Sequence, residues 1–269
     1  LHHKKLEKQT SEIAVTMDKL SLPRGQMETD YQKMLRSLYI TLQQQINELE
    51  NGQVEQAEYF TMWVHQIKTP IAALRLLLAE EEDERSQEMW EELFSIEQYV
   101  EMALQFSRLS AKSTDFVIGE VSLDKVVREA IHKYARLFVR KKIKMELSSI
   151  DTQVVTDEKW LEFVIEQILS NAIKYTAGGT ISVYLKEEPE QETKELVIED
   201  TGIGIAPEDL PRIFEKGYTG YNGHADKRST GIGLYLCRKI MRKLSHEITI
   251  ESEIGVGTKV HLEMRSRDK

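Results

Sequence analysis

His65 is the side chain whose surroundings most suggest chemistry, because it stands on a helical pattern at a position that packing does not need. The stretch W-V-H-Q-I-K-T-P occupies residues 63–70. Thr69 lies one turn beyond His65 on the same face, since helical residues four apart stack over one another. Pro70 removes the amide hydrogen that would bond the carbonyl of Gln66, so we expect a bend there. A lone surface histidine is more often a solvated side chain, and this stretch alone favours that interpretation.

Three glycine-bearing segments form a second group of candidate residues. They read D-T-G-I-G-I from residue 200, T-G-I-G-L from residue 230 and G-V-G-T from residue 255. Glycine lets backbone amides approach a phosphate, and Gly231 and Gly233 open a predicted helix whose N-terminus favours anions. Asp200 ends a predicted strand, so its carboxylate can accept a hydrogen bond from an exocyclic amine in a pocket. Each segment is equally compatible with an ordinary turn.

A helical segment with the sequence S-N-A-I-K-Y-T supplies a third group at residues 170–176. The amide oxygen of Asn171 can ligate magnesium, which accepts hard oxygen donors. Lys174 could reach a phosphate, and Tyr175 could lie against a base. The alternative is a buried asparagine whose amide is satisfied by backbone groups.

Apolar periodicity predicts two helices that position His65. The first carries a seam at alternating steps of four and three, formed by Phe60, Val64, Ile67, Ile71, Leu74 and Leu78. The second repeats the pattern with Met89, Leu93, Ile96, Val100 and Ala103. The acidic run at 80–84 is a solvated turn between them. A hairpin cannot close a core alone, so we expect a homodimer with four helices.

Regions on either side of this hairpin follow from the same patterns. Leucines at helical spacing upstream predict that the first helix starts well before His65, with an interruption at Asn51-Gly52 and a helical linker over residues 1–50. The pattern breaks near residues 112–119, where we place a domain boundary.

Strands and helices alternate after this boundary, which predicts an α/β sandwich. We expect helices at 123–139, 157–175 and 231–244, and strands at 143–147, 153–155, 180–186, 195–199, 248–252 and 259–264. The segment 205–230 is too long to be only a connector, and it suggests a lid.

Composition excludes several classes of function. The chain has 269 residues, 41% hydrophobic and 30% charged, which suits a helical segment plus one compact domain. Its net charge of -9 argues against direct binding of nucleic acid. A single cysteine, Cys237, excludes an intramolecular disulfide and indicates a reducing setting. No apolar run in the sequence is long enough to span a membrane.

Six motifs together resemble the H, N, G and F boxes of bacterial sensor histidine kinases of two-component systems. They are H-Q-I-K-T-P, N-A-I-K-Y-T, D-T-G-I-G, I-F-E-K-G, S-T-G-I-G-L and G-V-G-T, spread over about residues 55–265. The segments W-V-H-Q-I-K-T-P-I and E-K-G-Y-T-G-Y-N-G resemble more narrowly the bacitracin-sensor type, which senses within the membrane and works with peptide-antibiotic transporters.

This resemblance implies an α+β chain. A dimerisation and histidine-phosphotransfer hairpin, a four-helix bundle in the dimer, would occupy residues 51–114. An ATP-binding α/β sandwich of the gyrase/Hsp90-like fold would occupy residues 115–269. The chain would be the cytoplasmic portion of a protein anchored in the bacterial membrane, acting in cell-envelope or antimicrobial-peptide stress.

The resemblance also implies roles for individual residues. His65 would be the phosphorylated nucleophile beside Gln66, and Thr69 would position water for dephosphorylation of a response regulator. Asn171 would hold Mg²⁺ and Asp200 would bind the adenine amine of ATP. The other implied nucleotide-binding residues are Lys174, Tyr175, Gly202, Gly204, Ile205, Phe214, Thr230, Gly231, Gly233, Leu234 and Thr258. The implied partners are a second copy, a response regulator and a peptide-antibiotic ABC transporter.

Two departures from the family pattern affect the expected chemistry. Gln66 stands where most of the family has a carboxylate; its amide can accept a bond from Nδ1-H of His65 but cannot take up the proton. Gln167 stands where related ATPases have a glutamate base, so hydrolysis of ATP by water should be slow. A phosphatase-dominant regulator and a nucleotide-gated scaffold without transfer are therefore the alternatives to a kinase.

Overall fold

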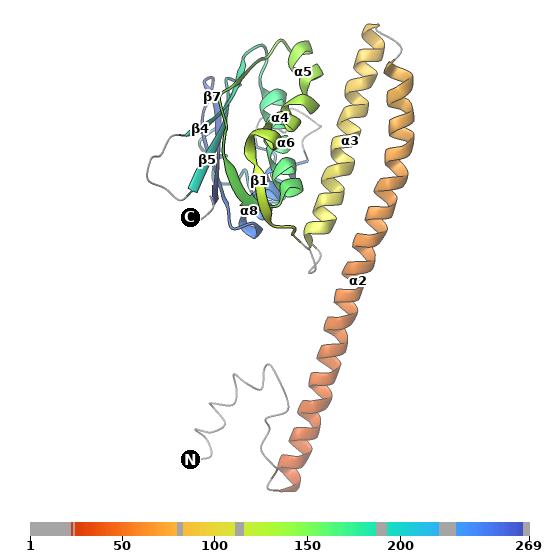
Figure 1. Ribbon diagram of the computed structural model, residues 1–269. Coiled ribbons are helices and arrows are strands. Elements are labelled where there is room, and N and C mark those ends of the chain that lie inside the picture. The colour runs from red at the N-terminus through yellow and green to blue at the C-terminus, as the bar shows by residue number, and fades with distance from the viewer. Residues whose placement is uncertain are drawn as a thin grey trace. The chain divides into compact units, whose positions relative to one another are not determined.

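The computed structural model describes residues 23, 25–79, 83–110, 116–186, 193–220 and 230–265. It contains two compact units (Figure 1): Leu1–Leu93 with Ser110–Lys112, and Phe94–Leu109 with Ser113–Lys269. The expected linker over residues 1–22 and the middle of the expected lid, residues 221–229, lie outside the described residues.

The first unit is dominated by helix α2 (Gln26–Ala79), which has 54 residues. This helix runs without a break through Asn51-Gly52 and Pro70, so the expected interruption at Asn51-Gly52 is wrong. One glycine costs a helix only about 1 kcal/mol, which its many neighbouring turns offset. No helix among the described residues is long and apolar enough to cross a membrane.

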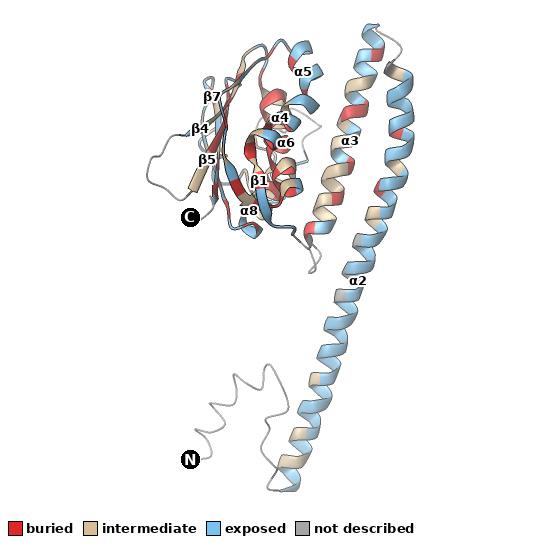
Figure 2. Ribbon diagram, in the orientation of Figure 1, coloured by how far each residue is buried: buried red, intermediate tan, exposed pale blue. Residues whose placement is uncertain are grey.

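Burial confirms part of the predicted seam. Val64 and Ile71 of α2 are buried, as is Leu93 of helix α3 (Glu84–Ser110). Met89 and Ile96 remain exposed, so the pattern predicted for the second helix is only partly right. Figure 2 shows that most of α2 is exposed as well. A single hairpin has one apolar side left over, which is the physical reason for the difference.

The second unit contains a small antiparallel sheet that the sequence did not predict in full. Strand β1 (Gly119–Ser122) pairs with β3 (Gln153–Thr156). Ser122 caps helix α4 (Leu123–Lys133) by accepting a hydrogen bond from the backbone of Lys125. The single helix predicted over 123–139 is divided at Tyr134, after which α5 (Ala135–Arg140) begins.

A five-stranded mixed sheet forms one layer of the unit. Its order is β2-β4-β5-β7-β6, with β2 and β4 parallel and the other neighbours antiparallel. The strands are β2 (Lys144–Leu147), β4 (Thr180–Lys186), β5 (Thr193–Asp200), β6 (Glu247–Glu253) and β7 (Gly257–Arg265). The expected strands are therefore present, with ends shifted by at most two residues.

Helices α4, α6 (Glu158–Tyr175) and α8 (Gly233–Lys243) lie on one face of this sheet (Figure 1). The core lies between them and includes Ile165, Leu169, Ile181, Leu196, Leu236, Ile240 and Leu262. Cys237 is a packing residue: it is fully buried, and burial raises the pKa of its thiol to about 12.

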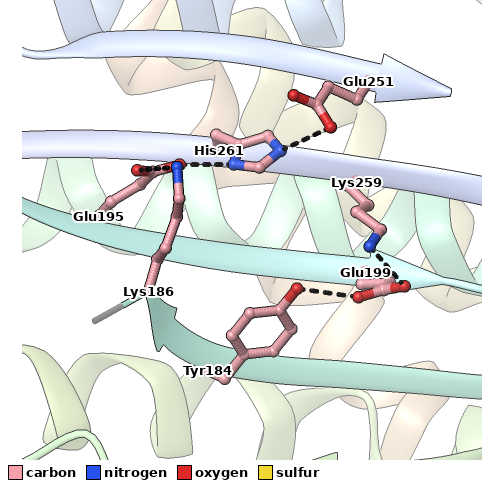
Figure 3. Close-up of polar contacts among 7 residues, drawn as sticks. All are labelled: Tyr184, Lys186, Glu195, Glu199, Glu251, Lys259 and His261. Atoms are coloured by element: carbon pink, nitrogen blue, oxygen red, sulfur yellow. Dashed lines mark hydrogen bonds and ion pairs between the residues drawn. The ribbon is translucent and has the colours of Figure 1, made fainter. Parts of the chain in front are cut away.

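The opposite face of the sheet is polar, as Figure 3 shows. Tyr184 donates a hydrogen bond to Glu199 at 2.9 Å, and His261 Nδ1 lies 2.6 Å from Glu195. Cross-strand pairs of this kind let a sheet face water on one side. The chain is thus a helical segment followed by an α/β sandwich, which confirms the predicted fold class.

Candidate nucleotide site and phosphoacceptor histidine

His65 is exposed on α2 beside the buried Val64, as its place next to the seam predicted. The hydroxyl of Thr69 donates to the carbonyl of His65 at 3.3 Å, so the two residues share one face of the helix. Within the described residues no hydrogen bond joins Gln66 to the imidazole. Consecutive residues on a helix point in different directions, which explains why that expected contact is not formed.

Helix α6 is the element that links the candidate nucleotide-binding residues. Asp157 caps the start of this helix, because its side chain accepts a hydrogen bond from the Trp160 amide at 3.1 Å. Asn171 lies about one turn before the end of this helix and is half-buried. The Lys174 ammonium lies 5.3 Å from the centre of the Tyr175 ring, so both predicted contacts for nucleotide stand together at the end of the helix.

Asp200 lies at the end of β5 and is buried, as expected for a residue that lines a pocket. Its Oδ1 accepts a hydrogen bond from the Gly202 amide at 2.8 Å. The Ile203 amide then donates to the carbonyl of Tyr175 at 3.2 Å. The D-T-G-I-G segment therefore connects β5 to the end of α6.

The electrostatics of Asp200 suit recognition of a neutral amine. Burial raises the pKa of its carboxyl, and bonds from the backbone of Gly202 and Thr258 partly offset this effect. An acceptor that is held by backbone amides keeps one orientation, so its remaining capacity is directed into the site.

Ser252 is a member of this cluster that sequence reasoning missed. Its hydroxyl accepts a hydrogen bond from the Ile205 amide at 2.9 Å and lies 2.9 Å from the hydroxyl of Thr258. Ser252 and Thr258 are cross-strand partners on β6 and β7. The register of this hairpin could have identified Ser252, because the G-V-G-T turn fixes which residue faces Thr258.

The T-G-I-G-L segment opens α8, as predicted. Gly231 has φ +63 and accepts a hydrogen bond from the Gly217 amide at 2.9 Å. A Cβ atom at this position would lie 2.5 Å from Gly217 C and 2.6 Å from Tyr218 O. Only glycine therefore fits here, and the turn leaves the first amides of α8 without a side-chain cap.

Gln167 and Gly233 bring α6 and α8 together. Gln167 is buried, and its Oε1 would lie 2.9 Å from a Cβ atom at position 233. Leu234 follows in the first turn of α8 and is half-buried. Thr230 is exposed, and its hydroxyl accepts from the Ile232 amide at 3.4 Å. The start of α8 thus faces the same helix as Asn171.

Phe214 is placed on the segment that precedes residues 221–229. The Arg238 guanidinium of α8 lies 5.0 Å from the centre of its ring. This cation–π contact ties the I-F-E-K-G motif to α8. The described contact of Phe214 is thus with α8, and its nucleotide contact stays a prediction.

Together these residues form two clusters connected by α6. Asp200, Gly202, Gly204, Ile205, Thr258 and Tyr175 lie around the end of β5, while Thr230, Gly231, Gly233 and Leu234 form the start of α8. One cluster offers a buried acceptor and the other offers uncapped helix amides, which favour anions. His65, Gln66 and Thr69 belong to the first unit and are not part of these clusters.

Comparison with known proteins gives a family and several relatives. Residues 156–268 match the family described as histidine kinase-, DNA gyrase B- and HSP90-like ATPase. The chain is 35% identical over 231 residues to the sensor histidine kinase YxdK of Bacillus subtilis (strain 168), which covers 86% of this chain and 71% of that protein. It is 35% identical over 198 residues to the sensor protein BceS of the same organism, covering 73% of this chain and 58% of that protein.

A solved structure shares the architecture. The full-length structure of ShkA in complex with AMPPNP matches 80% of this chain and 47% of its own, with a TM-score of 0.57 and 20% identity. At this identity the match supports the fold alone.

Proposed function

The chain belongs to the sensor histidine kinases, and on that premise we propose that it transfers the γ-phosphoryl group of ATP to His65 and then to an aspartate of a response regulator. The observation that carries this proposal is the convergence on α6 of a buried carboxylate, Asp200, and the uncapped start of α8. These groups suit the two ends of a nucleotide, its amino-purine base and its phosphates.

The proposed transfer forms a bond between Nε2 of His65 and the γ-phosphorus and breaks the bond to the β,γ-bridging oxygen, so that ADP leaves. Nε2 attacks as the neutral imidazole, and the proton on Nδ1 is then lost to solvent or to a neighbouring acceptor. His65 is exposed, so its ring is accessible to a bound nucleotide. Catalysis would rest mainly on alignment and on neutralisation of charge.

Asn171 is the residue that would hold Mg²⁺. Among the described residues no group of three or more His, Cys, Asp or Glu could hold a metal ion. One amide oxygen fits Mg²⁺, which usually keeps several waters and nucleotide phosphates as ligands. When bound, the ion would neutralise charge on the phosphates. The ammonium group of Lys174, on the same helix as Asn171, would place a second positive charge near the phosphates.

We propose a homodimer as the working form. Apolar side chains that a single hairpin leaves exposed include Leu74, Met89 and Ile96. A second copy would cover them in a bundle. Leu74→Lys should therefore shift the chain toward monomers in analytical ultracentrifugation, whereas Lys68→Gln on the same helix should not.

Thr69 supports an additional phosphatase activity toward the response regulator. Its hydroxyl is exposed one turn from His65 and can hold a water molecule. Thr69→Ala should leave labelling of His65 unchanged and slow the loss of phosphate from the regulator.

We further propose a role in cell-envelope or antimicrobial-peptide stress, with a membrane anchor and a peptide-antibiotic transporter as partner. This proposal rests on the resemblance of W-V-H-Q-I-K-T-P-I and E-K-G-Y-T-G-Y-N-G to the bacitracin-sensor type, and the similarity to the sensor protein BceS is consistent with it. Fractionation of the whole protein and co-purification with such a transporter would test this part of the proposal.

The proposed function is tested by incubation of the chain with γ-labelled Mg-ATP beside His65→Gln. Label that survives alkali, is lost in acid and is absent from His65→Gln would support a phosphohistidine at this position. Label of equal amount in His65→Gln would assign the phosphate to another residue.

A further inference from the structure

Tyr218 has no role in the function proposed above, yet its contacts converge on the nucleotide cluster. It is half-buried and follows Gly217 in the segment that supports α8. Its hydroxyl donates a hydrogen bond to Asp209 Oδ1 at 2.5 Å. Asp209 is buried. The bond joins two residues that lie nine positions apart, in a part of the chain without regular strands or long helices.

The acceptor of this bond is itself held in place by backbone contacts. The Asp209 amide donates to the carbonyl of Ala206 at 2.9 Å, and the Asp209 carbonyl accepts from the Arg212 amide at 2.8 Å. A hydrogen bond to a carboxylate is stronger than one between neutral groups. The bond to Asp209 also raises the pKa of the Tyr218 hydroxyl, which therefore remains a donor at neutral pH.

A second contact fixes the ring of Tyr218. The Arg212 guanidinium lies 4.2 Å from the ring centre, and its Nε lies 3.2 Å from Glu215. The ring is thus held from one side by a cation, while its hydroxyl is held by Asp209. Both contacts limit rotation of the side chain and, with it, movement of the backbone to which it is attached.

The backbone of Gly217 and Tyr218 lies directly against Gly231. A Cβ atom at Gly231 would lie 2.6 Å from the carbonyl oxygen of Tyr218 and 2.7 Å from its amide nitrogen. The neighbouring Gly217 amide donates to the Gly231 carbonyl at 2.9 Å. The position of Tyr218 therefore determines where Gly231 can lie, and Gly231 directs the chain into α8.

We propose that Tyr218 is a positioning residue for nucleotide binding: its hydroxyl, held by Asp209, fixes the turn at Gly231 and so orients the first amides of α8 toward the phosphates. This inference rests on the proposed function, because it assumes that α8 receives the phosphates. It assigns Tyr218 no contact with the base, which lies with Asp200 in the other cluster.

The experiment compares the affinity for a ligand that carries phosphates with the affinity for one that carries only the base and sugar. Loss of the hydroxyl should weaken binding of ligands that carry phosphates and leave binding of adenosine unchanged. Tyr218→Phe should lower the affinity of the full chain for Mg-ATP by about three- to tenfold, the range that the net loss of one ordinary hydrogen bond produces. Isothermal titration with Mg-ATP and with adenosine measures both affinities.

A matched control is available on the polar face of the sheet. Tyr184 also donates to a carboxylate, Glu199, at 2.9 Å, on the face of the sheet opposite α6 and α8 (Figure 3). Tyr184→Phe makes the same chemical change and should leave both affinities unchanged. Asp209→Asn is a second variant that preserves shape and should weaken Mg-ATP in the same direction. The double variant Tyr218→Phe/Asp209→Asn should be no weaker than the worse of the two single variants.

The outcomes separate this inference from the proposed function. Wild-type chain that bound no Mg-ATP would overturn both. If the wild-type chain binds Mg-ATP and Tyr218→Phe and Asp209→Asn bind it with the same affinity, the positioning role alone is overturned. Equal weakening of Mg-ATP and adenosine in Tyr218→Phe would also contradict it, because general loosening of the domain moves both affinities. Should Tyr218→Phe fail to fold, the two affinities of Asp209→Asn decide.

Discussion

His65, the proposed phosphoacceptor, and Asp200, the proposed adenine-binding residue, lie in two regions with opposite surroundings. His65 stands exposed on a long helix, and the hydroxyl of Thr69 donates to its backbone carbonyl at 3.3 Å. Asp200 is buried and is held by the backbones of Gly202 and Thr258. An acceptor must be reachable by a large donor, whereas a binding group must be fixed before the ligand arrives.

This difference predicts where substitutions do harm. The nucleotide cluster depends on close contacts among several elements, so changes there should disturb both folding and binding. The surface around His65 depends on one helix, so changes there should alter chemistry without altering stability.

The largest effect is expected for Gly231→Ala. Its φ of +63 and its contacts with the backbone of Gly217 and Tyr218 leave no room for a Cβ atom. Nucleotide affinity should fall more than about tenfold, and stability should fall by roughly 2–4 kcal/mol. Gly178→Ala is the matched control, because Gly178 has φ +68 with no atom within 4 Å of the added Cβ. It should cost only about 1 kcal/mol in urea unfolding. Equal costs for both variants would contradict this account of Gly231.

A smaller effect is expected from Lys133→Met. Lys133 Nζ lies 2.6 Å from both carboxylate oxygens of Glu166, which is nearly buried. Because the lysine is partly exposed, we expect a loss of about 1–3 kcal/mol, below the range for fully buried pairs. Lys125→Met removes a similar contact between α4 and α6, the exposed pair with Glu158 at 2.8 Å, and should cost much less stability than Lys133→Met because water screens the pair. Urea unfolding compares the two. A larger loss of stability in Lys125→Met than in Lys133→Met would contradict this prediction.

The pH dependence of stability should involve His246, a buried histidine of the second unit. Burial lowers the pKa of its imidazole from the usual 6.5, and Arg265 adds to this effect. The unfolded chain therefore binds this proton more readily than the folded chain, so stability falls as the pH drops below about 6.5 toward the lowered folded value. Urea midpoints between pH 7.5 and 5.5 measure this slope, and His246→Leu should flatten it. An unchanged slope in His246→Leu would assign the effect to other groups.

The smallest effect is expected for Gln66→Glu. A carboxylate at this position could take up the proton that leaves His65, which an amide cannot do. The rate of labelling should rise by a few-fold, on the order of a weak general-base contribution, because the residue does not contact the imidazole in the described structure. Gln66→Met should lower or maintain the rate. Both variants should keep wild-type urea midpoints, and a lower rate in Gln66→Glu would argue against proton transfer at this position.

The sequence predicted the elements that carry long periodic patterns. The strands at residues 180–186 and the helix that contains Asn171 lie where the pattern placed them. The four-residue strand β1 was missed, because such a short segment with a single buried residue has no detectable alternation. The expected interruption at Asn51-Gly52 was wrong, since a long helix tolerates one unfavourable residue.

Site residues that belong to sequence motifs could be predicted. Residues that join the site only through tertiary contacts could not. Asp200 and Gly231 stand in recognisable segments, and the structure gives both a defined environment. Ser252 could have been found only from the register of the hairpin that pairs it with Thr258. Tyr218 and Asp209 lie nine positions apart in a segment without periodic structure, so their spacing carries no signal. The exposed state of Met89 and Ile96 could not be predicted from one hairpin, because a helical pattern does not reveal which side a second copy covers.

The most direct test of the central claim measures nucleotide binding and labelling side by side in wild type, His65→Gln and Asp200→Asn. The division between acceptor and nucleotide site predicts that His65→Gln binds Mg-ATP with wild-type affinity and takes up no label. Asp200→Asn should lose at least about tenfold in affinity and its labelling at low ATP should fall in proportion. Undiminished label in His65→Gln, or undiminished binding in Asp200→Asn, would contradict the account.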